Sequence, residues 1–510
     1  MTDPTFLPAW RLAELIRGGA FSCLELLDHC IARVERLDSR TNAVVVRDFD
    51  RARERARALD RQRKDGRTTP LFGVPMTVKE SFNLEGHPTT WGYEQQRNSV
   101  AHEDALAVQR LTAAGAVVFG KTNVPVGLAD WQSFNPVYGT MSNAWNLAHT
   151  PGGSSGGSAA AIAAGFSALE IGSDIGGSIR VPAHYCGVFG HKPSWGLCSG
   201  RGQSLIPTAG TTDIAVIGPL ARSARDLSLA LEAIAGADPL QDIGSVTLPP
   251  PRALRLSDLR VAVWPSQPEQ ETDAETTALI DALGEFLERE GATVSRTARP
   301  EFHVTEAFHL YVRLLAAALS GRATEEFLAK MREAKARRAA DDMSADAVFE
   351  RTVDMTHREW LHLNEHRFKI RRIWGQFFRD WDVLLCPVIS TPALAHMQQG
   401  ETWERQTTVN GRTIPYNEML FWPGITCGFH LPASVAPIGV SEKGLPIGVQ
   451  IVGPFHGDRT TLHVAELLEK PLAQFRATDR LGLSERPFQK ATNGSRLALA
   501  QRRRPTCAMF

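Results

Sequence analysis

Residues 152–183 read GGSSGGSAAAIAAGFSALEIGSDIGGSIRVPA, with two glycine-rich runs that each carry a serine, Ser154 and Ser178. Glycine lacks a Cβ, so backbone N–H groups in such runs can approach a small polar group closely. A serine at the end of a run therefore has an oxyanion site beside its hydroxyl. Between the runs, a helix-forming stretch at 158–164 is followed by a short apolar strand pattern at 168–171.

This helix–strand alternation recurs along the chain and predicts an α/β sheet wrapped by helices. Further helix–strand pairs are expected at 104–114 with 116–119, 226–235 with 260–264, and 275–290 with 293–296. Additional strands are expected at 71–78, 383–387 and 447–452, and additional helices over 9–37 and 50–64. We expect one domain over 1–490, a mostly helical insertion at about 302–380 that caps the site, and a flexible tail at 491–510.

Composition and charge exclude several classes of protein. The 56 basic and 56 acidic residues cancel, so no global charge favours nucleic acid. The N-terminal ten residues have no apolar signal-peptide core, and no run of about 18 apolar residues is present, so no membrane anchor is expected. The seven cysteines form no Cys-x-x-Cys pair, which favours a reducing cytoplasm over a disulfide framework.

Lys79 is the third chemically notable residue. Alternating apolar residues in the expected strand 71–78 place Lys79 on the opposite strand face. A lysine in apolar surroundings can lose its proton near neutral pH and act as a base, whereas a lone lysine at a strand end usually reaches solvent. Together with the two serine runs, Lys79 indicates acyl transfer without a metal or a histidine.

Other interpretations of these residues remain open at this level. Ser155 fits the Gly-x-Ser-x-Gly elbow, but the polar residues 145–151 before it do not predict the core strand that an elbow requires. A phosphate loop would need a Lys-Ser/Thr ending that the run lacks. Cys186 could be a thiol nucleophile or a small buried residue. The histidines show no zinc-binding spacing, so no metal site is expected.

The first run extends through residue 160 and the second through Ala183, and together they resemble the signature of the amidase signature family. The resemblance covers most of the chain and is strongest from 73 to 193. Supporting segments are 73–80, 120–125, 135–139 and 190–193, with weaker ones at 382–387 and 445–453. It implies a large mixed twisted sheet covered by helices on both faces, and it points to a stand-alone bacterial-type amidase.

The resemblance also implies a Ser–cisSer–Lys triad. Carried over to this sequence, Ser178 is the nucleophile, Ser154 the bridging serine after a cis peptide bond, and Lys79 the base. The spacing between the two runs selects Ser154 rather than Ser155. The expected oxyanion donors are the N–H groups of Ile175, Gly176, Gly177 and Ser178. We assign supporting roles to Ser155, Asp174 and Arg180, the last two as an opposite-charge pair that fixes the loop. Glu80 replaces the aspartate that many members have after the lysine.

The expected activity is hydrolysis of a small-molecule carboxylic amide through a seryl acyl-enzyme, with no cofactor. Three alternatives remain: a component resembling the A subunit of glutamyl-tRNA amidotransferase, an ester or carbamate hydrolase, and a non-catalytic binding protein. Val181 and the segment 128–131 depart from the A-subunit pattern. Leu128, Trp131, Phe421 and Trp422 are expected to line the pocket, where aromatic walls suit an apolar acyl or aryl group. A homodimer is expected by analogy.

Overall fold

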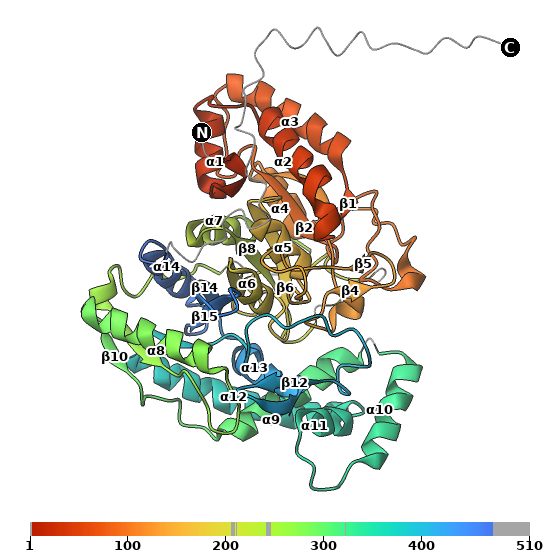
Figure 1. Cartoon of the computed structure of the whole chain (residues 1–510), viewed down its shortest axis with the longest axis vertical. Helices are drawn as coiled ribbons and strands as arrows, with labels where there is room; N and C mark the ends of the chain where they lie inside the picture. Colours follow the sequence, from red (N-terminus) through yellow and green to blue (C-terminus); the bar gives the residue numbers. More distant parts are fainter. Residues whose placement is uncertain (1–2, 206–209, 211, 241–245, 322, 473–510) are drawn as a thin grey trace, which may run out of the picture.

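The computed structural model describes residues 3–205, 210, 212–240, 246–321 and 323–472. The tail expected at 491–510 lies outside these residues, and the extent of the domain stays a prediction. An eight-stranded mixed sheet forms the centre of the molecule (Figure 1). Its strands, in spatial order, are β10 (Thr293–Ser295), β9 (Arg260–Val263), β11 (Val383–Pro387), β15 (Pro446–Val452), β14 (Ala433–Val440), β7 (Phe189–Lys192), β8 (Val216–Ala221) and β6 (Leu169–Asp174).

The two ends of this sheet differ in direction. β10, β9 and β11 are parallel, whereas every pair from β11 to β6 is antiparallel. The parallel strands are joined by crossovers, of which α8 (Ala274–Arg289) connects β9 to β10. This arrangement confirms the α/β class and the mixed sheet.

Helices cover both faces of the sheet. Along β9 and β11, successive side chains enter two different hydrophobic cores, as the alternation of a strand requires. The first core includes Val261, Val263, Val383 and Leu385, and the second includes Ala262, Leu384 and Cys386. The first core includes residues of α5 (Gly156–Ala163), α6 (Arg180–Cys186), α7 (Ala224–Ile234), α8 and α14 (Asp458–Glu469), and it continues into the N-terminal helices. The second core includes residues of α9 (Val304–Ser320), α11 (Ala345–Thr352), α12 (His357–Asp380) and α13 (Phe421–Cys427).

A small sheet and the N-terminal helices form one end of the molecule (Figure 1). The sheet has the order β1 (Val44–Arg47), β3 (Val117–Thr122), β2 (Pro75–Lys79), and its helices are α1 (Ala9–Arg17), α2 (Cys23–Leu37), α3 (Phe49–Lys64) and α4 (Leu106–Ala113). Ser22 caps α2, and Glu25 completes a capping box. β2 packs beside β6, which brings Lys79 close to the second glycine-rich run.

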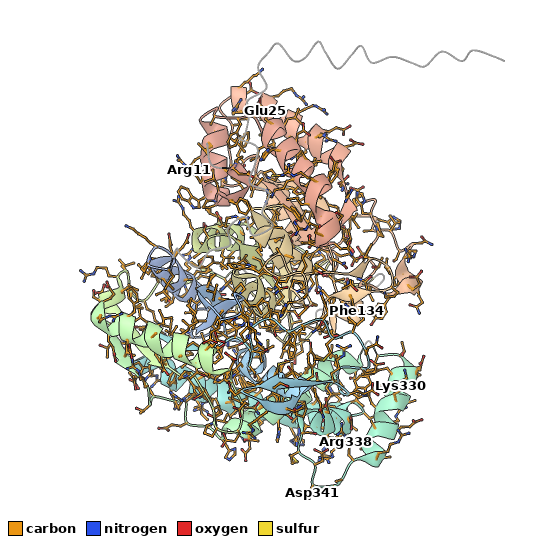
Figure 2. All side chains as sticks on the ribbon, in the orientation of Figure 1. Arg11, Glu25, Phe134, Lys330, Arg338 and Asp341 are labelled. Carbon is orange, nitrogen blue, oxygen red and sulfur yellow. The ribbon has the colours of Figure 1, made fainter. Side chains whose placement is uncertain are left out.

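The segment 302–380 forms four helices, α9, α10 (Glu325–Arg337), α11 (Ala345–Thr352) and α12. α10 and α11 lie at the end of the molecule opposite α1 to α3 (Figure 1). Lys330 of α10 and Asp341, between α10 and α11, are both exposed, and Figure 2 labels them together with Arg338. Two hairpins complete the fold, β4 (Phe134–Asn135) with β5 (Gly139–Thr140) and β12 (Gln406–Val409) with β13 (Arg412–Pro415). Short 3-10 helices are η1 (Pro4–Phe6), η2 (Asp38–Arg40), η3 (Glu94–Gln96), η4 (Val126–Leu128), η5 (Leu256–Asp258) and η6 (Tyr416–Leu420).

Candidate active site

Lys79 ends strand β2 and is completely buried, so the solvent-reaching alternative for this residue is wrong. Its Nζ donates hydrogen bonds to Ser154 Oγ at 2.7 Å and to Ser173 Oγ at 3.0 Å. Burial lowers the pKa of Lys79 to about 7, and the carboxylates of Asp174 and Glu80 act in the opposite direction. A substantial fraction of Lys79 is therefore neutral near pH 7 and able to accept a proton.

Ser154 lies in the loop before α5, and the Gly153–Ser154 peptide bond is cis, as the resemblance implied. The loop passes very close to the segment around Asp130: a Cβ at Gly153 would lie 2.1 Å from the Asp130 carbonyl oxygen. Only glycine fits at such a distance. This close approach fixes the backbone next to Ser154, whose side chain is 1% exposed.

Ser178 follows β6 and faces the same cavity as Ser154. It is 6% exposed, and its carbonyl oxygen accepts a hydrogen bond of 3.0 Å from the Ser155 backbone N–H, which ties the two glycine-rich runs together. Among the described residues, no hydrogen bond joins Ser178 Oγ to Ser154 Oγ. The structure thus brings the three expected triad side chains to one place, with the Lys79–Ser154 contact already formed.

Three of the four residues expected to supply oxyanion donors line the cavity, namely Ile175, Gly176 and Ser178, and Gly177 is the exception. The Gly177 N–H donates to Asp174 Oδ1 at 2.8 Å, and Gly177 does not line the cavity. Its expected role as an oxyanion donor is therefore wrong, because this N–H already has a buried carboxylate partner. Within the described part of the chain, the N–H groups of Ile175, Gly176 and Ser178 have no protein acceptor, and all three residues line the cavity.

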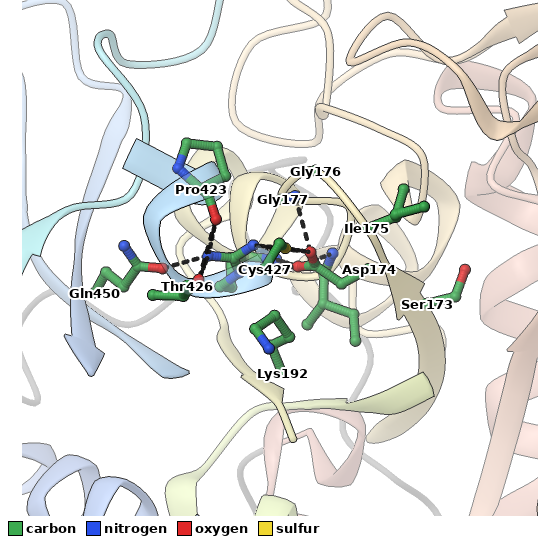
Figure 3. Close-up of polar contacts among 12 residues, drawn as sticks. Ser173, Asp174, Ile175, Gly176, Gly177, Lys192, Pro423, Thr426, Cys427 and Gln450 are labelled. Atoms are coloured by element: carbon green, nitrogen blue, oxygen red, sulfur yellow. Dashed lines mark hydrogen bonds and ion pairs between the residues drawn. The ribbon is translucent and has the colours of Figure 1, made fainter. Parts of the chain in front are cut away.

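Asp174 and Arg180 form the expected pair and are both fully buried (Figure 3). The guanidinium contacts both carboxylate oxygens, at 2.8 and 2.9 Å, and also donates to the Pro423 carbonyl and Thr426 Oγ1. Burial alone would raise the pKa of Asp174, but the charge and hydrogen bonds of Arg180 hold it well below its usual range. Asp174 therefore stays ionised and holds the backbone N–H groups of Gly177 and Ile179.

Ser154, Ser173 and Ser178 line a cavity of about 240 Å³. Its walls are mainly apolar: α9, α10 and α11 supply Val312, Leu315, Leu319, Phe327, Met331 and Phe349. Leu128 and Trp131 line the cavity as expected, and Leu420 and Tyr416 join them. An apolar wall with a small polar centre is the usual form of a small-molecule site.

Phe421 and Trp422 do not line this cavity, so their assignment to the pocket is wrong. Both are fully buried in the second core, where they pack edge-on against Trp264. Trp422 Nε1 donates to Thr272 Oγ1 at 2.9 Å, and Thr272 does not line the cavity either. Leu420, just before α13, takes the position at the wall instead.

Sequence reasoning missed three residues that contact the site. Ser173 Oγ accepts hydrogen bonds from Lys79 Nζ and from Gln203 Nε2, the latter at 3.2 Å. Tyr311 Oη donates to the Ile175 carbonyl at 3.2 Å. Ser173 lies inside the second glycine-rich run, and the alternation of side chains along a strand could have predicted its position at the site. Gln203 and Tyr311 lie in segments without a local signal.

The rival nucleophiles are not at the cavity. Ser155 is completely buried, and its Oγ contacts the backbone of Ser173. Cys186 is also completely buried, and burial raises the pKa of its thiol. Across the described residues, no group of three His, Cys, Asp or Glu side chains is placed to hold a metal ion. Nor does any described helix have the length and apolar character needed to cross a membrane.

Comparisons with known proteins agree with this geometry. A family model described as Amidase matches residues 25–462. The chain is 31% identical over 500 residues to the A subunit of the glutamyl-tRNA(Gln) amidotransferase of Roseiflexus castenholzii, covering 92% of this chain and 96% of that protein. Fatty-acid amide hydrolase 2 of Homo sapiens is 29% identical over 504 residues, covering 92% and 90%. The solved structure of 6-aminohexanoate cyclic dimer hydrolase with substrate has a TM-score of 0.74 and 29% identity, covering 92% and 97%.

Proposed function

The chain belongs to the amidase family, and from this premise we propose that it hydrolyses carboxylic amides of small molecules through an acyl-enzyme on Ser178. One observation carries the proposal: a buried lysine with a pKa of about 7 donates to Ser154, which lines the same cavity as Ser178. A base of this pKa matches a reaction run near neutral pH.

In the proposed reaction, neutral Lys79 accepts the Ser154 hydroxyl proton while Ser154 accepts the proton of Ser178. Ser178 Oγ then bonds to the amide carbonyl carbon, and the N–H groups of Ile175, Gly176 and Ser178 receive the developing oxyanion. The relay returns a proton to the amide nitrogen as the C–N bond breaks, because an amine anion is a poor leaving group. Water repeats the cycle and releases the acid. Contacts such as Ser178–Ser154 often shorten only once substrate binds.

The apolar cavity supports an amide with an apolar acyl or aryl group as the substrate. The relative fatty-acid amide hydrolase 2 is named for an amide of this kind, and 6-aminohexanoate cyclic dimer hydrolase is named for another amide. An ester or carbamate with the same apolar part would fit the same walls. The scattered cysteines support the cytoplasm as the compartment.

The likeness to the A subunit of a glutamyl-tRNA(Gln) amidotransferase favours a second candidate, in which this chain is one component of a larger complex. The two candidates differ in what the isolated chain can do. A stand-alone amidase is active alone, as a monomer or as the expected homodimer, whereas a component of a complex co-purifies with partner chains. Purification of the tagged chain from its own cells, followed by mass measurement of the native assembly, separates them.

Labelling with a fluorophosphonate serine probe, followed by peptide mass spectrometry, tests the nucleophile. We expect one adduct, on Ser178, and hydrolysis of at least one member of a panel of apolar, aryl and short amides. The Ser178→Ala variant serves as the control and should show neither. An adduct on Ser155, or undiminished hydrolysis by Ser178→Ala, would contradict the proposal.

A further inference from the structure

We propose that Tyr311 is a positioning residue, which directs the Gly176 N–H into the cavity by holding the carbonyl of the same peptide unit. The inference rests on the proposed function, because it assigns the Gly176 N–H to the oxyanion. It also goes beyond that function, since Tyr311 lies far away in the sequence, on helix α9.

The contact acts through the planarity of the peptide. Tyr311 Oη donates to the Ile175 carbonyl oxygen at 3.2 Å. In a trans peptide the C=O and the following N–H point in opposite directions, so fixing the Ile175 C=O fixes the Gly176 N–H. Burial raises the pKa of Tyr311 well above its ordinary value, so the hydroxyl keeps its proton and remains a donor. Gly176 and Ile175 both line the cavity, whereas Tyr311 lies behind them.

The phenol ring has little freedom to move. Tyr311 is completely buried, and α13 passes so close that a Cβ at Gly424 would lie 2.3 Å from the ring. On the other side, a Cβ at Gly176 would lie 3.0 Å from the Tyr311 hydroxyl. The ring is thus confined between α13 and the oxyanion loop, and its hydroxyl is held at one point relative to both.

The adjacent peptide unit is held in the same manner by different partners. Trp131 Nε1 donates to the Gly176 carbonyl at 3.2 Å, and the Gly177 N–H of that unit donates to Asp174. Figure 3 shows the Gly177–Asp174 contact beside Ile175 and Gly176. The loop is therefore held at two consecutive carbonyls, that of Ile175 by Tyr311 and that of Gly176 by Trp131. Of these anchors, Tyr311 is the one whose peptide unit directs a free N–H into the cavity.

The helix that carries Tyr311 also forms the cavity wall. Val312, the next residue on α9, lines the cavity, and so do Leu315 and Leu319. A group that packs against this wall contacts the same rigid element that orients the oxyanion donor. The structure therefore couples the apolar wall to the reacting centre through one helix.

The Tyr311→Phe variant tests the inference, because it removes the hydroxyl and keeps the ring. Removal of one oxyanion donor typically costs about 10²–10³ in rate, so misdirection of one should lower kcat about 10- to 100-fold. We expect KM to change less than about threefold, because the contacts with the cavity wall are kept. The rate should still fall as the pH drops through about 7, since Lys79 is unchanged. Tyr185→Phe is the matched control, since it removes another completely buried phenol hydroxyl, from α6, and should retain kcat.

Inhibitor binding separates positioning from a general structural effect. A trifluoromethyl ketone forms a tetrahedral oxyanion with the serine, so its Ki should rise in Tyr311→Phe in parallel with the loss of kcat/KM, while the Ki of the acid product should not. An unchanged ketone Ki, an equal rise for both inhibitors, or an unchanged kcat would overturn the inference. A wild-type protein that hydrolyses no amide would instead contradict the proposed function. Titration with the fluorophosphonate counts the folded active sites, and kcat is calculated per titrated site. A variant that is partly unfolded is therefore not mistaken for one with a slower reaction.

Discussion

Lys79 Nζ lies 2.7 Å from Ser154 Oγ, and both side chains are cut off from solvent. Strand β2 of the small sheet supplies the lysine and the loop before α5 supplies the serine, while the second contact of Lys79, with Ser173 on β6, joins the small sheet to the large one. A lysine in this position is costly while charged, because burial removes its hydration. The same cost is what makes Lys79 a base near neutral pH.

Substitution of Lys79 should therefore lower kcat/KM and remove its pH dependence near pH 7. The neutral amine is the active form, so wild-type kcat/KM should fall as the pH drops through about 7 and level off above it. General-base catalysis contributes about 10²–10⁴, and we expect Lys79→Met to lower kcat/KM by that factor and to lose the limb near pH 7. Steady-state rates between pH 5 and 9 measure both effects.

Lys121→Met is the appropriate control for this experiment. Lys121 is also completely buried, and burial lowers its pKa to about 8, but its Nζ donates to the Pro88 carbonyl and Thr89 Oγ1 outside the cavity. This variant should keep the limb near pH 7. If Lys121→Met lost the limb and Lys79→Met kept it, the assignment of the base would be wrong.

The bridging serine should matter more for amides than for esters. An amine must be protonated before it leaves, whereas an alcohol or phenol leaves more readily without a proton. Ser154→Ala interrupts the proton path between Lys79 and Ser178, so hydrolysis of an amide should fall at least tenfold more than hydrolysis of the ester with the same acyl group. Matched amide and ester substrates measure the ratio. Equal losses would mean that Ser154 only shapes the loop.

The site could be located from the sequence because its residues cluster in short motifs. Lys79, Ser154 and Ser178 all lie in segments whose glycine content or strand alternation marks them locally. Tyr311 has no such mark, because its contact with Ile175 arises only when α9 packs beside the loop that follows β6. Phe421 was wrongly assigned to the pocket because an aromatic side chain suits a pocket wall and a core equally. In the structure it is part of the core around α13.

The three strands between β15 and β6 were harder to predict than the rest of the large sheet. β9, β11 and β15 are near-continuous apolar runs and were expected, whereas β7, β8 and β14 were not. β8 contains Gly218 and Pro219, and β14 contains Pro437 and Gly439, residues that usually argue against a central strand. Pro437 has no backbone N–H to donate. It lies next to a register irregularity in the pairing of β14 with β15, and such an irregularity tolerates the loss of this donor.

Removal of one wall side chain should change substrate preference rather than the chemistry. Phe327 of α10 lines the cavity and packs edge-on against Trp403, another wall residue. Phe327→Ala should raise KM for an aryl or long acyl amide about tenfold, which corresponds to about 1.4 kcal/mol of lost apolar contact. Short amides should be unaffected. Phe368→Ala on α12 is the control, since Phe368 is 47% exposed and away from the cavity. Similar KM changes in both variants would argue against an apolar substrate.

Glu170 provides a prediction about stability outside the site. It lies on β6, is 1% exposed, and accepts a hydrogen bond from Thr77 Oγ1. Burial raises its pKa from 4.5 to about 8, although the hydrogen bond from Thr77 acts in the opposite direction. Between these pH values the folded protein binds one proton more than the unfolded chain, so the free energy of unfolding falls as the pH rises, by about 1.4 kcal/mol per pH unit.

Glu170→Gln should remove this penalty, because glutamine has the same shape and no charge. Its thermal midpoint should equal that of the wild type near pH 5. The difference between the two midpoints should grow in favour of the variant up to about pH 8 and stay constant at higher pH. Unfolding monitored at pH 5, 6.5, 8 and 9 gives the comparison, with Glu285→Gln, an exposed position on α8, as a control that shows no such trend. A pH-independent difference would mean that the carboxyl group is ionised in the folded protein. A lower midpoint at every pH would mean that the amide cannot satisfy the contact with Thr77.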